Sequence, residues 1–278
     1  MQNTKKKLLT ITNLKKYFPV GKEKAFSKNQ LYVRANDDIS LDIYEGETLG
    51  LVGESGCGKS TFGRVLLQLY PQTAGSTMYY GRTLDEMAPK YVGKTLKNAS
   101  KMVAHYHEAQ KKADEALKKY EEAGENVTHE QSNEKDRLVT EAENALNHTA
   151  KILGGFMVCN NIEEPAKVLY DAYEDKVKLF QLKKQREQQA LRAAKKDKKG
   201  NTNEKAVAKL SEMDQQIEEL TKKCAEANKK VEQEKEKYRS LPDFAKYEAL
   251  KDEGVDLSRL TYSEIRHLRK DLQIPILP

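Results

Sequence analysis

Hydrophobic and polar positions alternate in the first eighty residues in the way that β-strands require. The runs LLTITNL (8–14), DDISLDI (37–43) and IYEGETLGLVG (43–53) are rich in strand-forming residues, and the second alternates strictly. GSTMYYG (75–81) reads as a further short strand bounded by glycines. This pattern predicts a sheet at the start of the chain, with a turn at its Glu-Gly-Glu segment (45–47).

The pattern changes to a helical one after residue 83. Lys, Glu, Gln and Ala dominate up to about residue 254, while Gly and Pro become sparse. Turn signals divide this block into four predicted helices, at 96–123, 134–157, 165–196 and 204–240. A fifth, shorter amphipathic helix is predicted after residue 256.

Two of these helices carry hydrophobic positions at heptad spacing. In the last long helix the seam consists of Leu210, Met213, Ile217, Leu220, Cys224, Ala227 and Val231. The first long helix has a weaker seam of Ala99, Val103, Tyr106, Ala113, Leu117 and Tyr120. Such seams predict helix pairing, which short connections turn into antiparallel hairpins. Pairing between two chains is a second arrangement that the pattern allows.

Composition narrows the class of protein. Of the 278 residues, 33% are charged and 38% hydrophobic, and the net charge of +6 comes from interleaved Lys, Arg, Asp and Glu. No basic block is visible, so we expect no nucleic-acid partner. Three cysteines lie far apart and five histidines share no ligand spacing, which predicts no metal centre built from them. No segment has the 18 apolar residues of a membrane span, and the start does not read as a signal peptide.

The candidate binding motif is GESGCGKS (53–60), which fits the phosphate-binding pattern G-x-x-x-x-G-K-[ST]. An apolar predicted strand precedes it, and a predicted amphipathic helix follows it. Glycines allow the backbone N–H groups to turn inward toward phosphate oxygens, and the helix that follows adds its positive end. Lys59 is expected on the β- and γ-phosphates, Ser60 on Mg²⁺ and Thr61 on the α-phosphate. The predicted nucleotide-binding residues are Gly53, Glu54, Ser55, Gly56, Cys57, Gly58, Lys59, Ser60 and Thr61.

The stretch GETLGLVGESGCGKST, followed by LLQLYPQTAGSTMYYG, resembles the ATP-binding subunit of an ABC transporter, most closely the oligopeptide/dipeptide importer branch. NLKKYFPV resembles the family segment whose aromatic side chain stacks on adenine. The resemblance puts Phe18 there, with Tyr17 as the alternative, while a plain core role for Phe18 stays open. It implies ATP and Mg²⁺ as ligands, and membrane permease subunits and a second ATP-binding subunit as partners. The expected location is cytoplasmic, peripheral on the inner face of the cell membrane.

The resemblance resumes in DLSRLTYSEIRHLRKDLQI (256–274) and divides the chain into three parts. The fold class expected is α/β: residues 1–82 form the first part of a P-loop domain of the ABC type. Residues 83–255 form a coiled-coil-like helical insertion, and residues 256–278 return to the domain. The family's coupling glutamine falls near Leu277, and Gln273 lies too early in the strand to replace it.

The chain contains no LSGGQ-like signature, no apolar strand ending in Asp-Glu and no switch histidine. ATP hydrolysis needs a carboxylate that polarises the attacking water and a signature loop from a second chain, so we expect no turnover by this chain alone. We interpret the chain as truncated or frame-interrupted. The P-loop strand is then expected to lack neighbours on at least one side.

Two other functions compete with the transporter interpretation. In one, the helical hairpins are the active element of an interaction protein and the P-loop is a vestigial or regulatory nucleotide site. In the other, the chain is an ATPase head of the SMC or DNA-repair type, which also carries coiled coil. The position of the helical block, ahead of the strand that leads to the glutamine, argues against the second.

Overall fold

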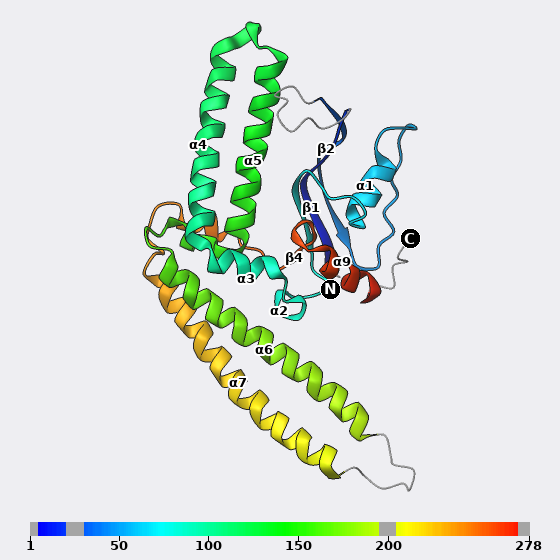
Figure 1. The fold of residues 1–278 in the computed structure, drawn as a ribbon, viewed down its shortest axis with the longest axis vertical. Helices are drawn as coiled ribbons and strands as arrows, with labels where there is room; N and C mark the ends of the chain where they lie inside the picture. Colours follow the sequence, from blue (N-terminus) through cyan, green and yellow to red (C-terminus); the bar gives the residue numbers. More distant parts are fainter. Residues whose placement is uncertain (1–4, 21–30, 195–203, 272–278) are drawn as a thin grey trace.

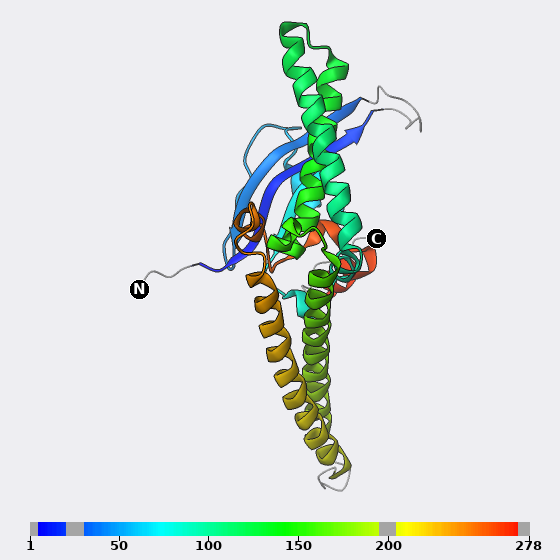
Figure 2. The same ribbon diagram turned by 90° about the vertical axis from the view of Figure 1, so that its left-hand side faces the viewer.

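The computed structural model describes residues 5–20, 31–194 and 204–271. It contains a small sheet, with short helices around it, and two long antiparallel helix pairs that extend from it in opposite directions (Figure 1). Seen from the side, the two helix pairs form one elongated body beside the sheet (Figure 2). Among the described residues the structure therefore combines a β-sheet with many helices, as the sequence pattern predicts.

The sheet has four described strands in the order β2-β1-β3-β4, and every neighbouring pair is antiparallel. Their bounds are β1 Lys7–Pro19, β2 Tyr32–Tyr44, β3 Ala74–Tyr79 and β4 Val255–Asp256. The predicted strands at 8–14, 37–43 and 75–81 are thus confirmed. β1 and β2 are longer than predicted because they pair with each other over their whole length, from Lys7 opposite Tyr44 to Pro19 opposite Tyr32.

One strand prediction is wrong for most of its length. Residues 47–53 form no strand, and among them Leu49, Leu51 and Val52 are exposed by 43%, 44% and 94%. A run of apolar residues is held as a strand only where neighbouring strands pair with its backbone. Among the described residues none pairs with this run, which agrees with the prediction that the P-loop segment lacks neighbours.

Helix α1 (Lys59–Leu66) packs across the β1–β2 pair and forms a small core with it. Phe62 and Val65 on one face of α1 meet Ile11 and Leu14 of β1, and all four side chains are at most 3% exposed. The spacing of three between Phe62 and Val65 places them on one side of the helix. This contact fixes α1, and with it the loop that precedes it, on the sheet.

The first helix pair consists of α4 (Ala99–Ala123) and α5 (His129–Leu153), joined by the 3₁₀ helix η1 (Gly124–Asn126). Helix α5 begins five residues earlier than predicted, since Thr128 and Gln131 form a capping box that satisfies its first N–H groups. Small buried residues line the contact and allow the helices to approach closely; these are Ala109, Ala113, Ala142 and Ala145.

The predicted seam of α4 includes Leu117, and the structure contradicts this position. Its side chain is 41% exposed, while the preceding residue, Ala116, is partly buried. The seam in this half of the helix follows Ala109, Ala113 and Ala116, because small side chains suit the close contact with α5 better than Leu.

The second helix pair consists of α6 (Glu163–Ala193) and α7 (Glu204–Glu236). The heptad seam predicted for α7 faces its partner: Met213, Cys224 and Val231 are buried, and the other seam positions are partly buried. Cys224 is therefore the small core residue that the spacing indicated, and burial raises the pKa of its thiol. Lys223 and Asp175 pair across the helices at 2.8 Å.

Short elements join the helix pairs to the sheet. They are α2 (Leu84–Met87), α3 (Lys90–Lys97), η2 (Gly154–Val158), α8 (Phe244–Glu248), η3 (Leu257–Arg259) and α9 (Tyr262–Asp271). The predicted first helix, 96–123, is divided between α3 and α4 at Asn98. The segment beyond Asp271, including Gln273, Pro275 and Leu277, lies outside the described residues.

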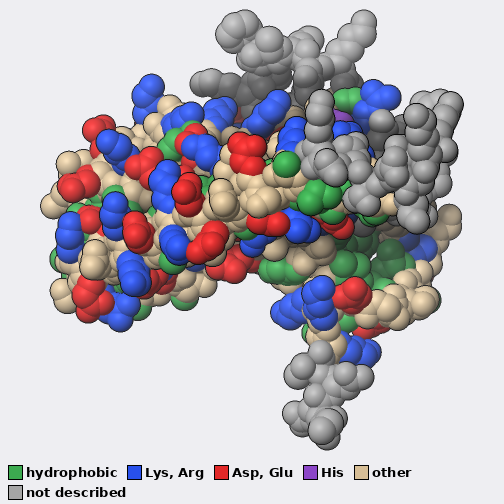
Figure 3. Space-filling model, turned by 90° about the horizontal axis from the view of Figure 1, so that it is seen from below, with side chains coloured by type: hydrophobic (Ala, Val, Ile, Leu, Met, Phe, Trp, Pro, Cys, Tyr) green, Lys and Arg blue, Asp and Glu red, His purple; other side chains and the backbone are tan. Residues whose placement is uncertain are grey.

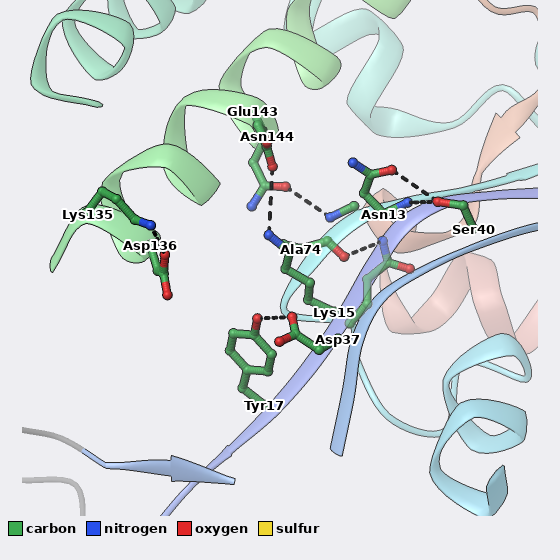
Figure 4. Close-up of polar contacts among 12 residues, drawn as sticks. Asn13, Lys15, Tyr17, Asp37, Ser40, Ala74, Lys135, Asp136, Glu143 and Asn144 are labelled. Atoms are coloured by element: carbon green, nitrogen blue, oxygen red, sulfur yellow. Dashed lines mark hydrogen bonds and ion pairs between the residues drawn. The ribbon is translucent and has the colours of Figure 1, made fainter. Parts of the chain in front are cut away.

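Helix α5 lies along the sheet and contacts three of its strands through polar groups; the contacts with β1 and β3 are drawn in Figure 4. Arg34 of β2 pairs with Asp136 at 2.9 Å, and the Gly75 N–H of β3 donates to Asn144 Oδ1 at 3.3 Å. Further along, Lys151 donates to Ser76 Oγ at 3.1 Å. The first helix pair is therefore fixed to the sheet by one side of α5.

The return of the chain to the sheet is fixed by a buried polar cluster. The backbone N–H of Asp256 in β4 donates to Tyr91 Oη at 2.9 Å. The guanidinium of Arg259 lies 4.3 Å from the Tyr91 ring and donates to Thr95 Oγ1 and to the His148 carbonyl oxygen. Residues more than 100 positions apart in sequence are thus held together where helices and sheet meet.

Positively and negatively charged side chains are interspersed on the surface. On the face seen in Figure 3, Lys and Arg side chains alternate with Asp and Glu over the helical part. Many of these charges pair along single helices, such as Arg137 with Glu134 and Glu141. In the part of the chain that the structure describes, no helix is both long and apolar enough to cross a membrane.

Candidate functional site

The predicted phosphate loop is an exposed turn at the amino end of α1. Residues 53–57 are exposed and Gly58, which precedes the helix, is partly buried. The backbone of Gly56 and Gly58 has φ values of 83° and 92°, in the left-handed region that favours glycine. The pattern of glycines read from the sequence therefore corresponds to the tight turns of this loop.

Position 58 also requires glycine because there is no room for a side chain there. A Cβ atom added to it would lie 2.2 Å from the carbonyl oxygen of Ala35 and 2.9 Å from Asn36 Nδ2. The Asn36 amide donates to the Gly58 carbonyl oxygen at 3.2 Å. Strand β2 thus supports the point at which the loop becomes helix, and any side chain there would push the two apart.

The ammonium group of Lys59 lies inside the loop. Its Nζ donates to the carbonyl oxygen of Gly53 at 2.7 Å and to that of Glu54, and it lies 3.3 Å from Cys57 Sγ. These contacts fix the positive charge in the concave side of the loop. A lysine held by neutral carbonyl groups can exchange them for phosphate oxygens, which offer a full negative charge.

The amino end of α1 suits an anion. Gly58, at the N-cap position, makes no side-chain capping bond, and the first turn contains no acidic residue. The N–H groups of this turn and the helix dipole therefore favour a negative ligand. Ser60 is exposed and Thr61 is partly buried, and both residues lie in this first turn.

The aromatic residues predicted for base stacking lie on β1. Phe18 is partly buried, and its ring contacts that of Tyr70 edge to face, with 5.7 Å between the centroids. The alternative, Tyr17, donates to Asp37 Oδ1, and the Arg34 guanidinium lies 5.4 Å from its ring. Tyr17 is therefore engaged with β2, whereas Phe18 lies beside the segment that follows α1.

Sequence reasoning missed three residues that shape the site. Asn36 supports Gly58, Tyr70 contacts Phe18, and Arg269 of α9 donates to the Leu67 carbonyl oxygen at the other end of α1. The contact of Asn36 depends on the register of β1 and β2, for which the sequence contains no local signal. The contacts of Tyr70 and Arg269 depend on tertiary packing alone.

Two grooves in the described part of the chain lie away from this loop. A groove of about 570 Å³ runs between α6 and α7 next to Leu191, and one of about 490 Å³ lies between α4 and α5 next to His105 and His148. Their lining comes from the helix pairs, and neither includes a residue of the loop. Within the described residues no group of three or more His, Cys, Asp or Glu could hold a metal ion.

A comparison with families of known proteins identifies a match that covers the loop. The family model described as "ABC transporter" matches residues 36–241, which is more than half of the chain. The match begins within β2, includes the loop and α1, and extends over both helix pairs. It begins after Phe18 and ends before β4.

Several curated proteins are similar over a shorter part. The putative oligopeptide transport ATP-binding protein YkfD of Bacillus subtilis is 48% identical over 83 residues, which are 30% of this chain and 23% of that protein. The oligopeptide transport ATP-binding protein OppF of Escherichia coli is 44% identical over 86 residues, 31% of this chain and 26% of that protein. The dipeptide transport ATP-binding protein DppF of Haemophilus influenzae is 47% identical over 79 residues, 28% of this chain and 24% of that protein. The chain spans about a quarter of the length of these relatives.

Proposed function

The chain belongs to the ABC transporter family, and from this premise we propose that it binds MgATP through residues 53–61. The resemblance to the oligopeptide and dipeptide branch agrees with the names of the relatives. The comparisons also favour the transporter interpretation over an interaction protein or an SMC-type head.

One observation carries the binding proposal. Lys59 lies in the concave side of a glycine-rich turn whose end, Gly58, is pressed against β2, and the helix that follows has an uncapped, acid-free first turn. The amino end of α1 and the Lys59 ammonium group therefore lie together at one end of the loop. Polyphosphate is the ligand whose charge and size suit it.

Each residue of the loop then has a role. Backbone N–H groups from Gly53 to Gly58, with the intervening Glu54, Ser55, Gly56 and Cys57, surround the phosphates. Lys59 binds β- and γ-phosphate oxygens, and Thr61 the α-phosphate. Ser60 holds Mg²⁺ together with phosphate oxygens and water, which is consistent with the preference of this ion for few protein ligands.

Phe18 is the residue proposed to stack on the base. Its ring is partly exposed and lies on the same β1–β2 pair that supports Gly58, so a nucleotide can extend from Phe18 to the loop. Stacking needs only a flat apolar face. The edge-to-face contact with Tyr70 fixes the orientation of that ring.

The wider role follows from the relatives. We propose that the chain contributes the nucleotide site of a transporter for oligopeptides or dipeptides, with membrane permease subunits and a second ATP-binding subunit as partners. Its place is then the cytoplasmic face of the membrane. These proposals transfer to this chain the transport role given in the names of its relatives, although the chain matches only about a quarter of their length.

The helix pairs are proposed to be an insertion, residues 83–255, in the nucleotide-binding domain. The chain leaves the sheet after β3 at Tyr79 and returns to the same strand with β4 at Val255, so the entry and exit points are neighbours. An element with adjacent ends can be added to a domain without changing its sheet. The pairs pack on themselves through their seams, so they need no second chain.

The binding proposal is tested with the purified chain and a fluorescent ATP derivative. Lys59→Ala is expected to lower the affinity for MgATP at least tenfold, because it removes the cation at the β- and γ-phosphates. Ser60→Ala is expected to lower only the part of the affinity that depends on Mg²⁺. Lys101→Ala on α4, an exposed lysine far from the loop in sequence, is the control and should bind as wild type does.

The same titrations separate the competing functions. Self-association with no effect of nucleotide would support an interaction protein instead. Binding to DNA that weakens steeply with salt would support the SMC-type interpretation. Equal MgATP affinity of the wild type and Lys59→Ala would refute the proposed site.

A further inference from the structure

Lys16 is a buried cation next to the proposed stacking residue. It lies in β1, its side chain is 9% exposed, and its Nζ is 4.7 Å from the Phe18 ring and 6.0 Å from the Tyr70 ring. Among the described residues no carboxylate pairs with it. Its burial lowers the pKa of the ammonium group, which expresses the cost of keeping the charge there.

Asn36, directly opposite on β2, has an unused hydrogen-bonding atom. Lys16 and Asn36 are cross-strand partners, so their side chains share one face of the sheet. Asn36 is 5% exposed; its Nδ2 donates to Gly58, but its buried Oδ1 has no hydrogen-bond partner. A buried cation without a carboxylate partner and a buried acceptor without a donor therefore lie at paired positions of β1 and β2.

Such an arrangement is unfavourable for the protein alone. A buried charge without a counter-charge and a buried acceptor without a donor each cost stability. Asn36 also contacts the amino end of α1 through Gly58, where the helix dipole favours a negative group. A ligand that brings an anionic oxygen and a hydroxyl group would compensate both.

We propose that Lys16 and Asn36 bind the nucleoside monophosphate part of the nucleotide, Lys16 through an α-phosphate oxygen and Asn36 Oδ1 through a ribose hydroxyl. This inference rests on the proposed binding of MgATP. Lys16 is two residues from Phe18, and Asn36 touches Gly58, so the pair lies between the base and the β- and γ-phosphates. The ribose and the α-phosphate are the groups that occupy this part of a nucleotide.

The decisive variant is Lys16→Met, which keeps the length and apolar stem of the side chain and removes the charge. Competition against a fluorescent ATP derivative is measured for MgATP and for AMP. Lys16→Met is expected to lower both affinities by about the same factor, roughly tenfold, since both ligands carry the phosphate next to the ribose. Lys59→Ala is expected to affect MgATP far more than AMP.

Thermal unfolding without nucleotide supplies a second readout. Removing a buried, unpaired charge is expected to leave the melting temperature unchanged or to raise it by a few degrees. The matched control is Lys15→Met, because Lys15 is the neighbouring lysine and pairs with Glu143 of α5 at 4.0 Å. It should leave both affinities unchanged.

The outcomes separate this inference from the proposed function. If Lys16→Met melts at a lower temperature and binds MgATP as wild type does, Lys16 is a structural residue and the inference is overturned, while loss of binding in Lys59→Ala still supports the nucleotide site. If neither variant changes the affinity, the proposed function itself fails. Should Lys16→Met not fold, Lys16→Arg and Lys16→Gln are compared; the inference requires the Arg variant to bind MgATP more tightly than the Gln variant.

Discussion

The guanidinium of Arg269 donates two hydrogen bonds, of 3.1 and 2.6 Å, to the carbonyl oxygen of Leu67, which lies 202 residues earlier in the chain. Leu67 is the C-cap residue of α1, so this contact satisfies a carbonyl group that the helix itself leaves free. A positive group at this end also complements the helix dipole. The segment that follows the helix pairs thus stabilises the helix that carries the phosphate loop.

Arg269→Ala is therefore expected to destabilise the chain by about 1 kcal/mol, the usual contribution of such a hydrogen bond. It should also weaken MgATP binding several-fold, since α1 positions the loop. Urea unfolding and the nucleotide titration measure the two effects. Arg266→Ala, which changes an exposed arginine of the same helix, is the control; equal losses in both variants would contradict a specific role of the Leu67 contact.

Gly58→Ala is expected to be strongly destabilising. The new Cβ would lie 2.2 Å from the Ala35 carbonyl oxygen on a backbone with φ of 92°, so both contact and conformation are strained. We expect a loss of about 2 kcal/mol or more and no measurable MgATP binding.

The matched control for this variant lies five residues away. Gly63 is in the middle of α1, and a Cβ there would meet nothing within 4 Å. Gly63→Ala should therefore gain up to about 1 kcal/mol from helix propensity and keep its MgATP affinity. Comparable destabilisation of the two variants would show that the close approach at Gly58 does not determine the loop.

Local patterns predicted most of the elements. The alternation in 37–43 and the glycine spacing in 53–58 are signals that act within a few residues, and both correspond to observed structure. The heptad seam of α7 was predicted for the same reason, because seven-residue spacing alone defines one face of a helix. Helix starts were less accurate where a side-chain cap, such as that of Thr128, decides them.

The features that could not be predicted from the sequence depend on contacts between residues that are far apart in the chain. Residues 47–53 have a strand-like sequence, but a strand forms only by pairing, and no described strand pairs with them. The support of Gly58 by Asn36 requires the register of β1 and β2 together with the packing of α1. The contact between Arg269 and Leu67 has no local signature at all.

The corrected seam of α4 can be tested by two truncations. Val103 is 9% exposed within the core between the helices, whereas Leu117 is 41% exposed. Val103→Ala should cost about 2 kcal/mol of unfolding free energy, and Leu117→Ala less than about 1 kcal/mol, although the second removes more atoms. Urea unfolding of both variants decides; a larger loss for Leu117 would restore the predicted seam.

Stability at mildly acidic pH is expected to depend on His148. Burial lowers the pKa of its imidazole to about 4, and neighbouring basic groups act in the same direction. These are Arg259 of η3, Lys151 of α5 and His105 of α4. The groove beside it is lined on α5 by Arg137 and Glu141 as well.

The sign follows from proton binding. In the unfolded chain the imidazole has its ordinary pKa of about 6.5 and takes up a proton first as the pH falls, so the contribution of His148 to stability decreases from about pH 6.5 toward pH 4. Between pH 7.5 and pH 5.0 this amounts to about 1–2 kcal/mol. His148→Gln should lose correspondingly less stability than wild type over that range in urea unfolding. His267→Gln, at an exposed position on α9, should follow the wild type. Identical losses in wild type and His148→Gln would mean that the imidazole is not held neutral by the residues around it.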